Sequence, residues 1–323
     1  MKSIYTFLAG AFLSLGCVTT LNAQSIFSLS ELNRSTRSVG MGGVSGAMDA
    51  NAFSIYDNGS KTAFSSKITE FGVQYSPWAK NLTDGMDRDN LMMNVGGYYS
   101  LDESNKLLLG VTYYALGGND MFETDMDGNV TGKKIEPSYL SASVGYARRI
   151  GGDWGVSAAV NYALWNPSVG DKISSLSVDL SVTRRFMMGN SDFFDLSLKA
   201  AGWGAAFTDL DDYKMPGLVS VSALYNKSFL EKHAINASVD LGARCLDESA
   251  FNASAGLEYG FNKFLFVRGG YHYTSFENDY NGFGSVGGGV RLFKAVQTDF
   301  AYLLAGSDSP LRNTFMVGLS VMF

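Results

Sequence analysis

The stretch Phe315–Phe323, with the sequence FMVGLSVMF, decides the fold. Large apolar side chains occupy every second position, and the positions between them hold Met, Gly or Ser. Successive side chains of a β-strand point to opposite faces, so this alternation predicts a strand with one strongly apolar face. The residues on that face are Phe315, Val317, Leu319, Val321 and Phe323.

The same period of two recurs along most of the chain. Clear examples are Leu176–Val182 and Phe251–Tyr259, in which apolar residues alternate with Ser, Asn, Asp, Glu or Gly. We count about fourteen such segments, at 67–79, 90–101, 105–118, 137–149, 153–165, 173–187, 192–207, 213–229, 232–245, 249–261, 263–275, 283–293, 295–305 and 312–323.

Strand length and connection length together favour a transmembrane barrel. A soluble β-sandwich would also alternate, but its strands are commonly about five or six residues long, roughly half the length expected here. Brief turns such as Ile150–Gly152 and Asn262 alternate with longer polar stretches such as Lys80–Asp89 and Leu116–Glu136. An even number of long antiparallel strands joined in this way is typical of bacterial outer-membrane barrels. The fold class expected is therefore all-β, with the N-terminus in the periplasm of a Gram-negative bacterium.

Composition agrees with a membrane location. Hydrophobic residues make up 46% of the chain and charged residues 17%, whereas a soluble domain carries about a quarter charged residues. The net charge of -6 argues against nucleic acid as a partner, because binding phosphates needs a basic face. After the N-terminal region, no apolar run reaches the roughly 20 residues of a transmembrane helix.

Residues 1–23 have the pattern of an export signal, with Lys2, an apolar core and a small-residue cleavage site ending at Ala23. Attachment of lipid at Cys17 is the alternative. If Cys17 leaves with the signal, Cys245 is the only cysteine, and no intramolecular disulfide can form.

Residues 24–66 differ from the predicted barrel at 67–323. They are rich in Gly, Ala, Ser and Asn and show no sustained period. Because side chains alone cannot fill a lumen of fourteen strands, we expect this segment to form a plug, or hatch, inside it. A disordered periplasmic arm is the alternative. Unpaired buried charges are costly, so we expect charges of the plug, namely Arg34, Arg37, Asp49 and Asp57, to pair with inward charges of the strands, namely Asp179, Asp240, Arg244, Glu258, Arg268 and Asp299.

Two regions resemble a known family. Arg37–Val44 and Ala47–Ala52 are similar to the opening of the PorV/PorQ family, whose members are similar in turn to FadL-type transporters. Phe264–Tyr271, Gly287–Leu292 and Thr314–Phe323 resemble that family's closing strands. Where the family commonly has an Asn-Pro-Ala type turn, this chain has Tyr56–Ser60. The terminal strand, with Phe315, Val317, Leu319, Val321 and Phe323, also resembles the insertion signal read by the outer-membrane assembly machinery.

The sequence predicts no enzyme and no cofactor. His233 and His272 stand in separate strands without a nucleophile elbow or a metal-binding helix motif. Asp125–Asn129 lacks the spacing of a calcium loop, and we expect an exposed hairpin tip there instead. Aromatic residues near strand ends are expected to form interfacial girdles; they are Tyr75, Trp78, Tyr98, Tyr99, Tyr113, Tyr114, Tyr146, Trp154, Trp165, Tyr271 and Tyr273.

The resemblance implies two possible roles. PorV-like members serve type IX secretion, with secretion components and exported cargo proteins as partners. FadL-like members admit hydrophobic small molecules through a lumen gated by the hatch. A purely structural outer-membrane protein is the third alternative, and outer-membrane lipids are partners in every case.

Overall fold

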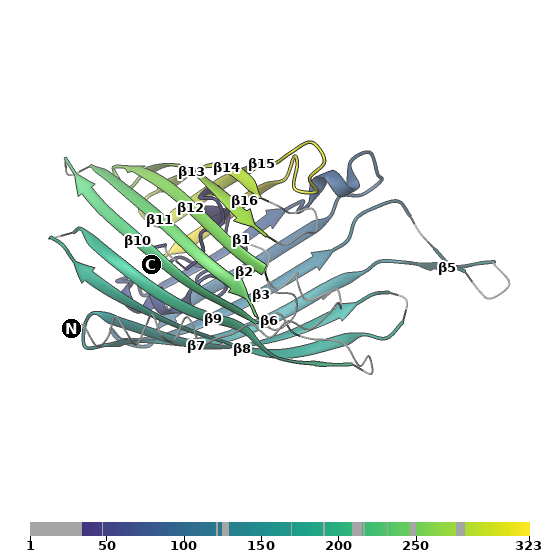
Figure 1. Ribbon diagram of the computed structural model, residues 1–323, viewed down its shortest axis with the longest axis horizontal. Helices are drawn as coiled ribbons and strands as arrows, with labels where there is room; N and C mark the ends of the chain where they lie inside the picture. The colour runs from purple at the N-terminus through teal and green to yellow at the C-terminus, as the bar shows by residue number, and fades with distance from the viewer. Residues whose placement is uncertain are drawn as a thin grey trace.

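The computed structural model describes residues 34–46, 48–120, 122–124, 129–168, 170–189, 191–208, 215, 217–230, 232–245, 250–275 and 282–323. Fourteen antiparallel strands form one closed barrel in the described chain. Figure 1 shows the strands tilted across the barrel, with residues 34–46 and 48–66 inside it. The predicted fold class is confirmed, and fourteen observed strands overlap the fourteen predicted segments.

The barrel strands are long, as lipid-spanning strands must be. Their bounds are β1 Thr69–Ser76, β2 Leu91–Ser100, β3 Asn105–Ala115, β6 Ser138–Ile150, β7 Trp154–Asn166, β8 Ile173–Met187, β9 Phe193–Phe207, β10 Leu218–Phe229, β11 His233–Arg244, β12 Ala250–Phe261, β13 Leu265–Thr274, β14 Phe283–Leu292, β15 Val296–Leu304 and β16 Phe315–Met322.

The barrel closes where β1 meets β16. Val73 lies opposite Leu319 across this seam, and Val73 also lies opposite Val95 of β2. The carbonyl oxygen of Phe323 accepts hydrogen bonds from the backbone N–H groups of Ile68 and Thr69. Closure satisfies the edge groups of the first and last strands, which is the condition for a sheet to sit in lipid.

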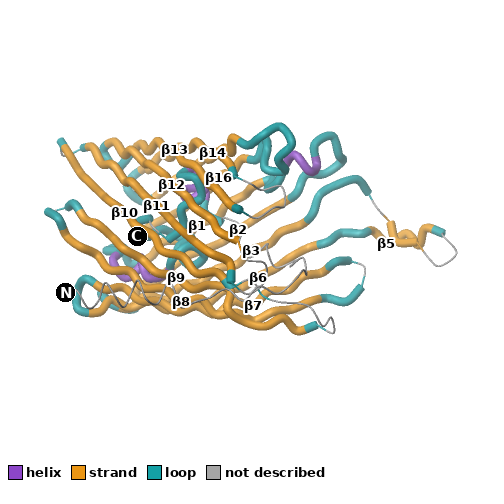
Figure 2. Tube along the Cα trace, in the orientation of Figure 1, coloured by secondary structure: helices purple, strands orange, loops and turns teal. Residues whose placement is uncertain are grey.

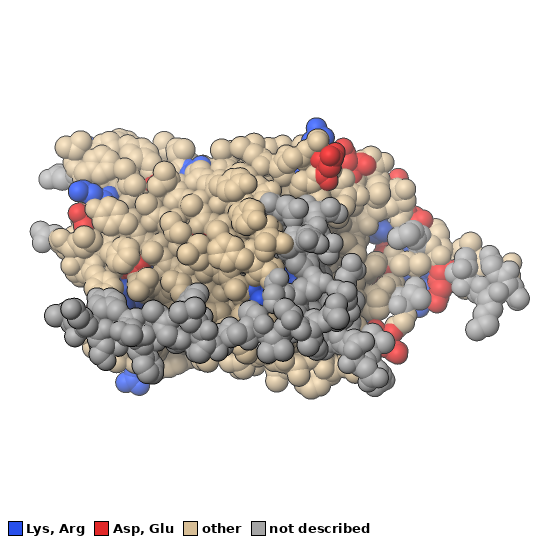
Figure 3. Space-filling view, in the orientation of Figure 1, with Lys and Arg blue, Asp and Glu red and all other residues tan. Residues whose placement is uncertain are grey.

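Apolar side chains cover the outer wall. In β16, the outward residues Val317 and Leu319 are exposed, whereas Met316 and Met322 face inward and are buried. The same alternation runs through β3, where Leu109, Val111 and Tyr113 are exposed. Charged side chains gather toward the ends of the barrel, with a largely uncharged surface between them (Figure 3). This band matches the hydrocarbon layer of a bilayer.

Short turns close one end and longer connections the other, as predicted. Asn262–Lys263 and Phe293–Lys294 both place two consecutive residues in the left-handed region, the backbone of a two-residue hairpin turn. The connection between β9 and β10 covers 208–217, because β10 begins at Leu218 and not at the predicted 213. Pro77 has no N–H to give to a strand ladder, which explains why β1 ends at Ser76.

A small hairpin, β4 Phe122–Thr124 paired with β5 Val130–Lys134, projects from the end with the long connections (Figure 1). The sequence analysis treated 116–136 as a loop with an exposed hairpin tip at 125–129, and it did not predict the two short strands that flank this tip. Its described residues in β5 are exposed on both faces or nearly so, so no alternation marks them.

Three short helices complete the described elements: α2 Thr36–Gly40, η2 Gly59–Phe64 and η3 Lys80–Thr83. Figure 2 shows α2 and η2 within the barrel and η3 at the end with the long connections. None of the helices in the described ranges has both the length and the apolar character needed to cross a membrane.

Candidate functional site in the barrel lumen

The lumen segment, residues 34–66, folds by local capping. Ser35 caps α2 by accepting a hydrogen bond from the N–H of Ser38, and Asn58 caps η2 by accepting one from Ser60. Gly42 and Gly43 both have positive φ just after α2, a backbone that glycine adopts without strain. The N–H of Gly43 donates to the carbonyl oxygen of Ser38 at 2.9 Å, so the chain turns at the end of α2, which explains the glycines at this point in the sequence.

An ion cluster fixes α2 to the strand wall. Arg37 donates to both carboxylate oxygens of Glu258, from Nε at 2.9 Å and from Nη2 at 2.6 Å. Glu258 also accepts from Arg268 at 2.5 Å, and Arg268 donates to Asp299 at 2.5 Å. Two guanidinium groups thus balance two carboxylates, and the paired arrangement of Arg37 gives directional strength.

A second ion cluster holds η2 to β8 and β9. Lys61 Nζ lies 3.3 Å from Asp195 Oδ2, which also accepts a hydrogen bond of 2.8 Å from Arg185. Burial lowers the pKa of the Lys61 ammonium, and the Asp195 carboxylate opposes that shift. Thr183 contributes a neutral contact, because its hydroxyl lies 2.7 Å from the hydroxyl of Ser60.

Further polar contacts extend around the wall. Gln74 of β1 accepts two hydrogen bonds from Thr36, and Ser285 of β14 accepts one from Gly42. Tyr56 donates to the carbonyl oxygen of Val95 in β2 at 2.6 Å. The lumen segment is therefore attached on several sides.

Wall glycines allow the lumen segment to lie against the strands. A Cβ atom at Gly256 would lie 2.2 Å from the carbonyl oxygen of Met41, far inside van der Waals contact. The wall glycines at which an added Cβ would come within 3 Å of an atom of the lumen segment include Gly72, Gly96, Gly110, Gly155, Gly256 and Gly270. Part of the high glycine content thus serves this contact.

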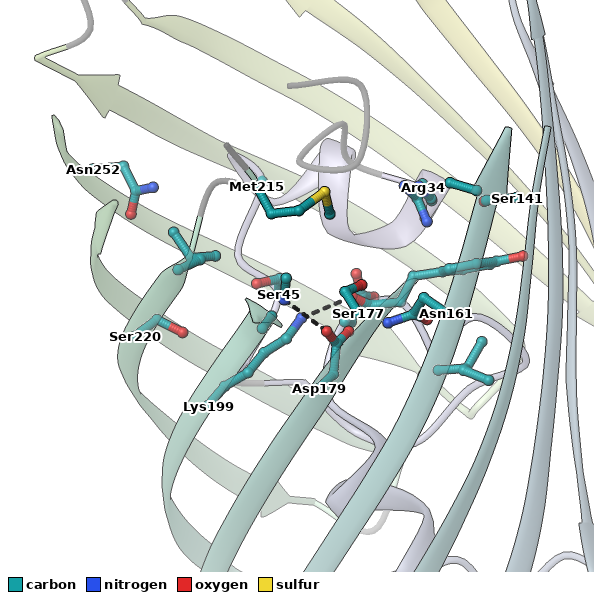
Figure 4. A pocket seen from close by; sticks show the side chains of 18 of the residues that line it. Arg34, Ser45, Ser141, Asn161, Ser177, Asp179, Lys199, Met215, Ser220 and Asn252 are labelled. Atoms are coloured by element: carbon teal, nitrogen blue, oxygen red, sulfur yellow. Dashed lines mark hydrogen bonds between the residues drawn. The ribbon is translucent and has the colours of Figure 1, made fainter. Parts of the chain in front are cut away.

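A polar cavity of about 150 Å³ remains between the lumen segment and the strands β6 to β13. Figure 4 shows Lys199, Asp179, Ser177 and Asn161 pointing into it from the wall, with Met215 above. The ammonium group of Lys199 donates to the carbonyl oxygen of Tyr56 at 2.8 Å. Serine hydroxyls form much of the remaining lining, from Ser45, Ser141, Ser175, Ser177, Ser220 and Ser254.

Two carboxylates of this lumen cavity carry an oxygen without a hydrogen-bond partner among the described residues. Asp57 is 4% exposed, and its Oδ2 is one of them. Asp240 is 7% exposed and accepts from the backbone N–H groups of Ser45 and Gly46 at Oδ2, whereas Oδ1 accepts no bond of regular geometry. Burial raises the pKa of Asp57 to about 7, with Lys199 opposing the shift.

The other predicted charges include members of the plug and of the wall. Asp49 lies 3.9 Å from both Arg37 and Arg185, so it bridges the two ion clusters loosely. Arg34 stacks over the ring of Tyr56, 5.1 Å from its centroid, and Arg244 is buried in β11. The five residues of the predicted insertion signal, Phe315, Val317, Leu319, Val321 and Phe323, are partly or fully exposed at the closure seam.

Several aromatic residues were wrongly expected in the interfacial girdles. Trp78, Tyr98, Tyr114 and Trp165 are buried and face the lumen, because they occupy inward positions or, for Trp78, fold inward beyond β1. All but Tyr98 join an apolar cluster with Tyr139, Ile173, Phe283 and others toward the long connections. Tyr75, Tyr99, Tyr113, Tyr146, Trp154, Tyr271 and Tyr273 are exposed.

The sequence analysis missed Lys61, Asp195, Arg185 and Lys199. Asp195 and Lys199 occupy alternate positions of β9 on the same face as Phe193, which is inward. That spacing was a usable signal. Nothing in the sequence would have paired Lys61 with Asp195, because the two are 134 residues apart.

Comparison with known proteins places the chain in a family. The sequence model of "Type IX secretion system protein PorV" matches residues 21–200, more than half of the chain. The chain belongs to this family. The matched range covers the lumen segment and the strands up to part of β9, so the closing motifs at 264–323 lie outside it. A search of curated proteins finds no match.

Solved structures with the same fold are outer-membrane channels. The Pseudomonas putida toluene transporter TodX aligns with a TM-score of 0.60 at 13% identity, over 90% of this chain and 99% of that one. The CymD monoaromatic hydrocarbon channel gives 0.55 at 11%, over 89% and 97%. A Pseudomonas aeruginosa FadL homologue gives 0.51 at 11%, over 89% and 97%. At these identities the likeness shows the fold alone, and the family and fold together are those of an outer-membrane barrel.

Proposed function

We propose that this PorV-family barrel serves type IX protein secretion at the outer membrane, handling exported proteins by surface contacts and not by passing molecules through its lumen. The attachment of the lumen segment carries this proposal. Ion clusters at Glu258 and at Asp195 hold it to β12 and β9, and the lumen cavity described above is about 150 Å³. A folded or extended protein cannot pass through such a space.

In this proposal the N-terminus and the short turns face the periplasm. The long connections and the β4–β5 hairpin then face the cell exterior, where secretion components or exported cargo make contact. The partners of the outer wall are outer-membrane lipids.

Uptake of hydrophobic small molecules is the second candidate. The apolar cluster containing Trp78, Tyr114 and Phe283 favours it, because it gives the lumen an apolar region near the long connections. The fold shared with TodX also favours it. The cavity lined by serines and carboxylates is unfavourable to a hydrocarbon, since burying polar groups against apolar surface has a cost.

A disulfide lock separates the two candidates. The hydroxyls of Ser60 and Thr183 lie 2.7 Å apart, so Ser60→Cys with Thr183→Cys places two thiols within bridging range. Cys245→Ala removes the described free thiol. The secretion proposal expects normal export of surface proteins in the native host with the lock oxidised, whereas uptake through a moving plug stops.

The controls are the two single-cysteine variants and the reduced double variant. Toluene or fatty-acid entry into proteoliposomes is measured on the same proteins. Export that stops on oxidation and returns on reduction would overturn the proposal, and uptake that follows the same switch would establish the second candidate.

A further inference from the structure

Two adjacent short turns of the barrel carry an excess of positive charge. Lys227 lies near the end of β10, Lys232 in the turn to β11 and Lys263 in the turn from β12 to β13, and all three are exposed. The turns are joined, because the N–H of Asn262 donates to the carbonyl oxygen of Lys232 at 2.5 Å. Glu231, the one carboxylate that the sequence places in these turns, lies outside the described residues and offsets only one of the three lysines.

The acidic residues of the adjoining strands do not balance this charge. β10 has none, and those of β11 and β12 are Asp240 and Glu258. Both are buried and face the lumen, where Glu258 is paired with Arg37 and Arg268. The outer side of the two turns therefore attracts an anion.

An aromatic cluster surrounds His233 at the same place on the outer wall. Its ring stacks on Phe229, with centroids 5.3 Å apart and planes at 17°, and the ring of Phe261 lies at the same centroid distance. Phe229, His233 and Phe261 are opposite one another across β10, β11 and β12, so they share one face of the sheet. That face is the outer one, because the exposed Ile235 follows His233 by two residues.

This cluster leaves one ring nitrogen of His233 for a ligand. The hydroxyl of Tyr259 lies 2.6 Å from Nδ1, and when it donates there, the hydrogen of the neutral imidazole is on Nε2. Nε2 has no hydrogen-bond partner within the described ranges, so it can donate to an anionic oxygen. Lys227 is close by, because it lies opposite Ile235 on the neighbouring strand.

The apolar surroundings indicate a lipid in preference to a soluble anion. Leu230, in the β10–β11 turn, is 79% exposed, and Phe264, beside the β12–β13 turn, is 46% exposed. A phospholipid brings a phosphate and acyl chains together, so the lysines and the imidazole meet the phosphate while the apolar wall meets the chains. The lysines disfavour a head group that carries its own cationic nitrogen.

We infer that the outer wall at the β10–β11 and β12–β13 turns binds the phosphate of an anionic phospholipid such as phosphatidylglycerol, with Lys227, Lys263 and His233 Nε2 as the donors. Binding does not depend on a role in secretion. The choice of phospholipid over lipopolysaccharide does rest on the proposed function, whose orientation puts the short turns at the periplasmic leaflet.

Native mass spectrometry of the purified full chain in a neutral detergent measures the binding. Dioleoyl phosphatidylglycerol is the probe, and phosphatidylcholine and phosphatidylethanolamine with the same chains are the controls. Each lysine near a lipid phosphate contributes about fivefold in affinity. We therefore expect one saturable phosphatidylglycerol, bound at least about tenfold more tightly than either control.

Substitutions test the residue assignment. Lys227→Gln and Lys263→Gln should each weaken phosphatidylglycerol binding about fivefold and leave phosphatidylcholine binding unchanged. His233→Phe keeps the stacked ring but removes the N–H, and it should weaken binding about tenfold. Lys172→Gln is the matched control, because Lys172 is exposed in the connection between β7 and β8, at the other end of the barrel. Heat-modifiable gel mobility verifies that each variant is folded.

Three results would overturn the inference. Equal affinity for phosphatidylglycerol and phosphatidylcholine would leave an ordinary aromatic girdle. A loss in Lys172→Gln as large as that in Lys227→Gln would make the effect a general attraction of charge. Unchanged affinity in folded His233→Phe would remove the imidazole from the site.

The lipid that copurifies with the barrel from native outer membranes identifies the source of the phosphate. We expect a phospholipid that is lost in Lys227→Gln. Lipopolysaccharide lost in the same variant would overturn the assignment to phospholipid and the orientation on which it rests, whereas the export of surface proteins is tested separately by the disulfide lock.

Discussion

The Arg37–Glu258 contact offers the sharpest test of how the lumen segment is held. Glu258 is 2% exposed and accepts hydrogen bonds from Arg37, Arg268 and Asn236. Glu258→Gln keeps the shape but removes the charge, so Arg268 is left with Asp299, and Arg37 is left with only the more distant Asp49, at 3.9 Å. Breaking a buried ion pair costs about 3–5 kcal/mol. The amide oxygen of the substituted side chain can still accept a hydrogen bond, so we expect a cost at the lower end of this range, about 3 kcal/mol.

Amide hydrogen exchange of the folded barrel measures this cost. At about 1.4 kcal/mol for each factor of ten, the variant should expose the amides of residues 34–46 to exchange about 100-fold faster. The strands themselves should exchange as before, because their ladders are unchanged. We expect the effect to be largest around α2, next to Arg37.

Glu70→Gln is the matched control. Glu70 is also 2% exposed, but its partners are Lys67 and Tyr98 and not α2. It should leave the exchange of residues 34–46 unchanged. Equal exchange in Glu258→Gln and Glu70→Gln would refute the claim that the ion cluster holds the segment in place.

Three further predictions concern packing, pH and assembly. Gly256→Ala brings a Cβ to 2.2 Å from the carbonyl oxygen of Met41. In the same exchange assay it should lower the free energy of opening residues 34–46 by about 1–3 kcal/mol. Gly284→Ala is the control and should not, because its Cβ would contact only Leu304, at 3.6 Å. Burial raises the pKa of Asp57 from 3.8 to about 7. The unfolding free energy, measured by urea titration, should therefore fall by at most about 4 kcal/mol as the pH rises from about 4 to 7. Asp57→Asn should not show this dependence on pH. Deleting Phe323 removes its backbone hydrogen bonds to Ile68 and Thr69, so the yield of heat-modifiable folded barrel should drop severalfold while the yield of unfolded chain does not.

The strands could be read from the sequence because each has one face in lipid. β8 occupies 173–187, the range predicted, since the alternation of Leu176, Val178 and Leu180 is uninterrupted. The short strands β4 and β5 were not predicted because no lipid imposes an alternating pattern on them. Local pattern is sufficient where the environment differs between the two faces of a strand.

The contacts of the lumen segment could not be predicted from the sequence alone. Arg37 and Glu258 were both recognised as charges needing partners, but 221 residues separate them in the chain. Which wall residue meets which plug residue depends on barrel register and on the turn at Gly42 and Gly43. The lumen cavity is harder still to predict, because it is the space that these contacts leave unfilled.

The closure seam has a consequence for the order of assembly. The lumen segment precedes β1 in the chain, whereas β16, the other side of the seam, is the final strand. Arg37 and Lys61 meet partners on β12 and β9, far from that seam in the strand order. We therefore expect the growing sheet to wrap around the N-terminal segment before its last strand arrives. The segment would then act as an internal template, and its loss would delay the sealing of the cylinder as well as empty it.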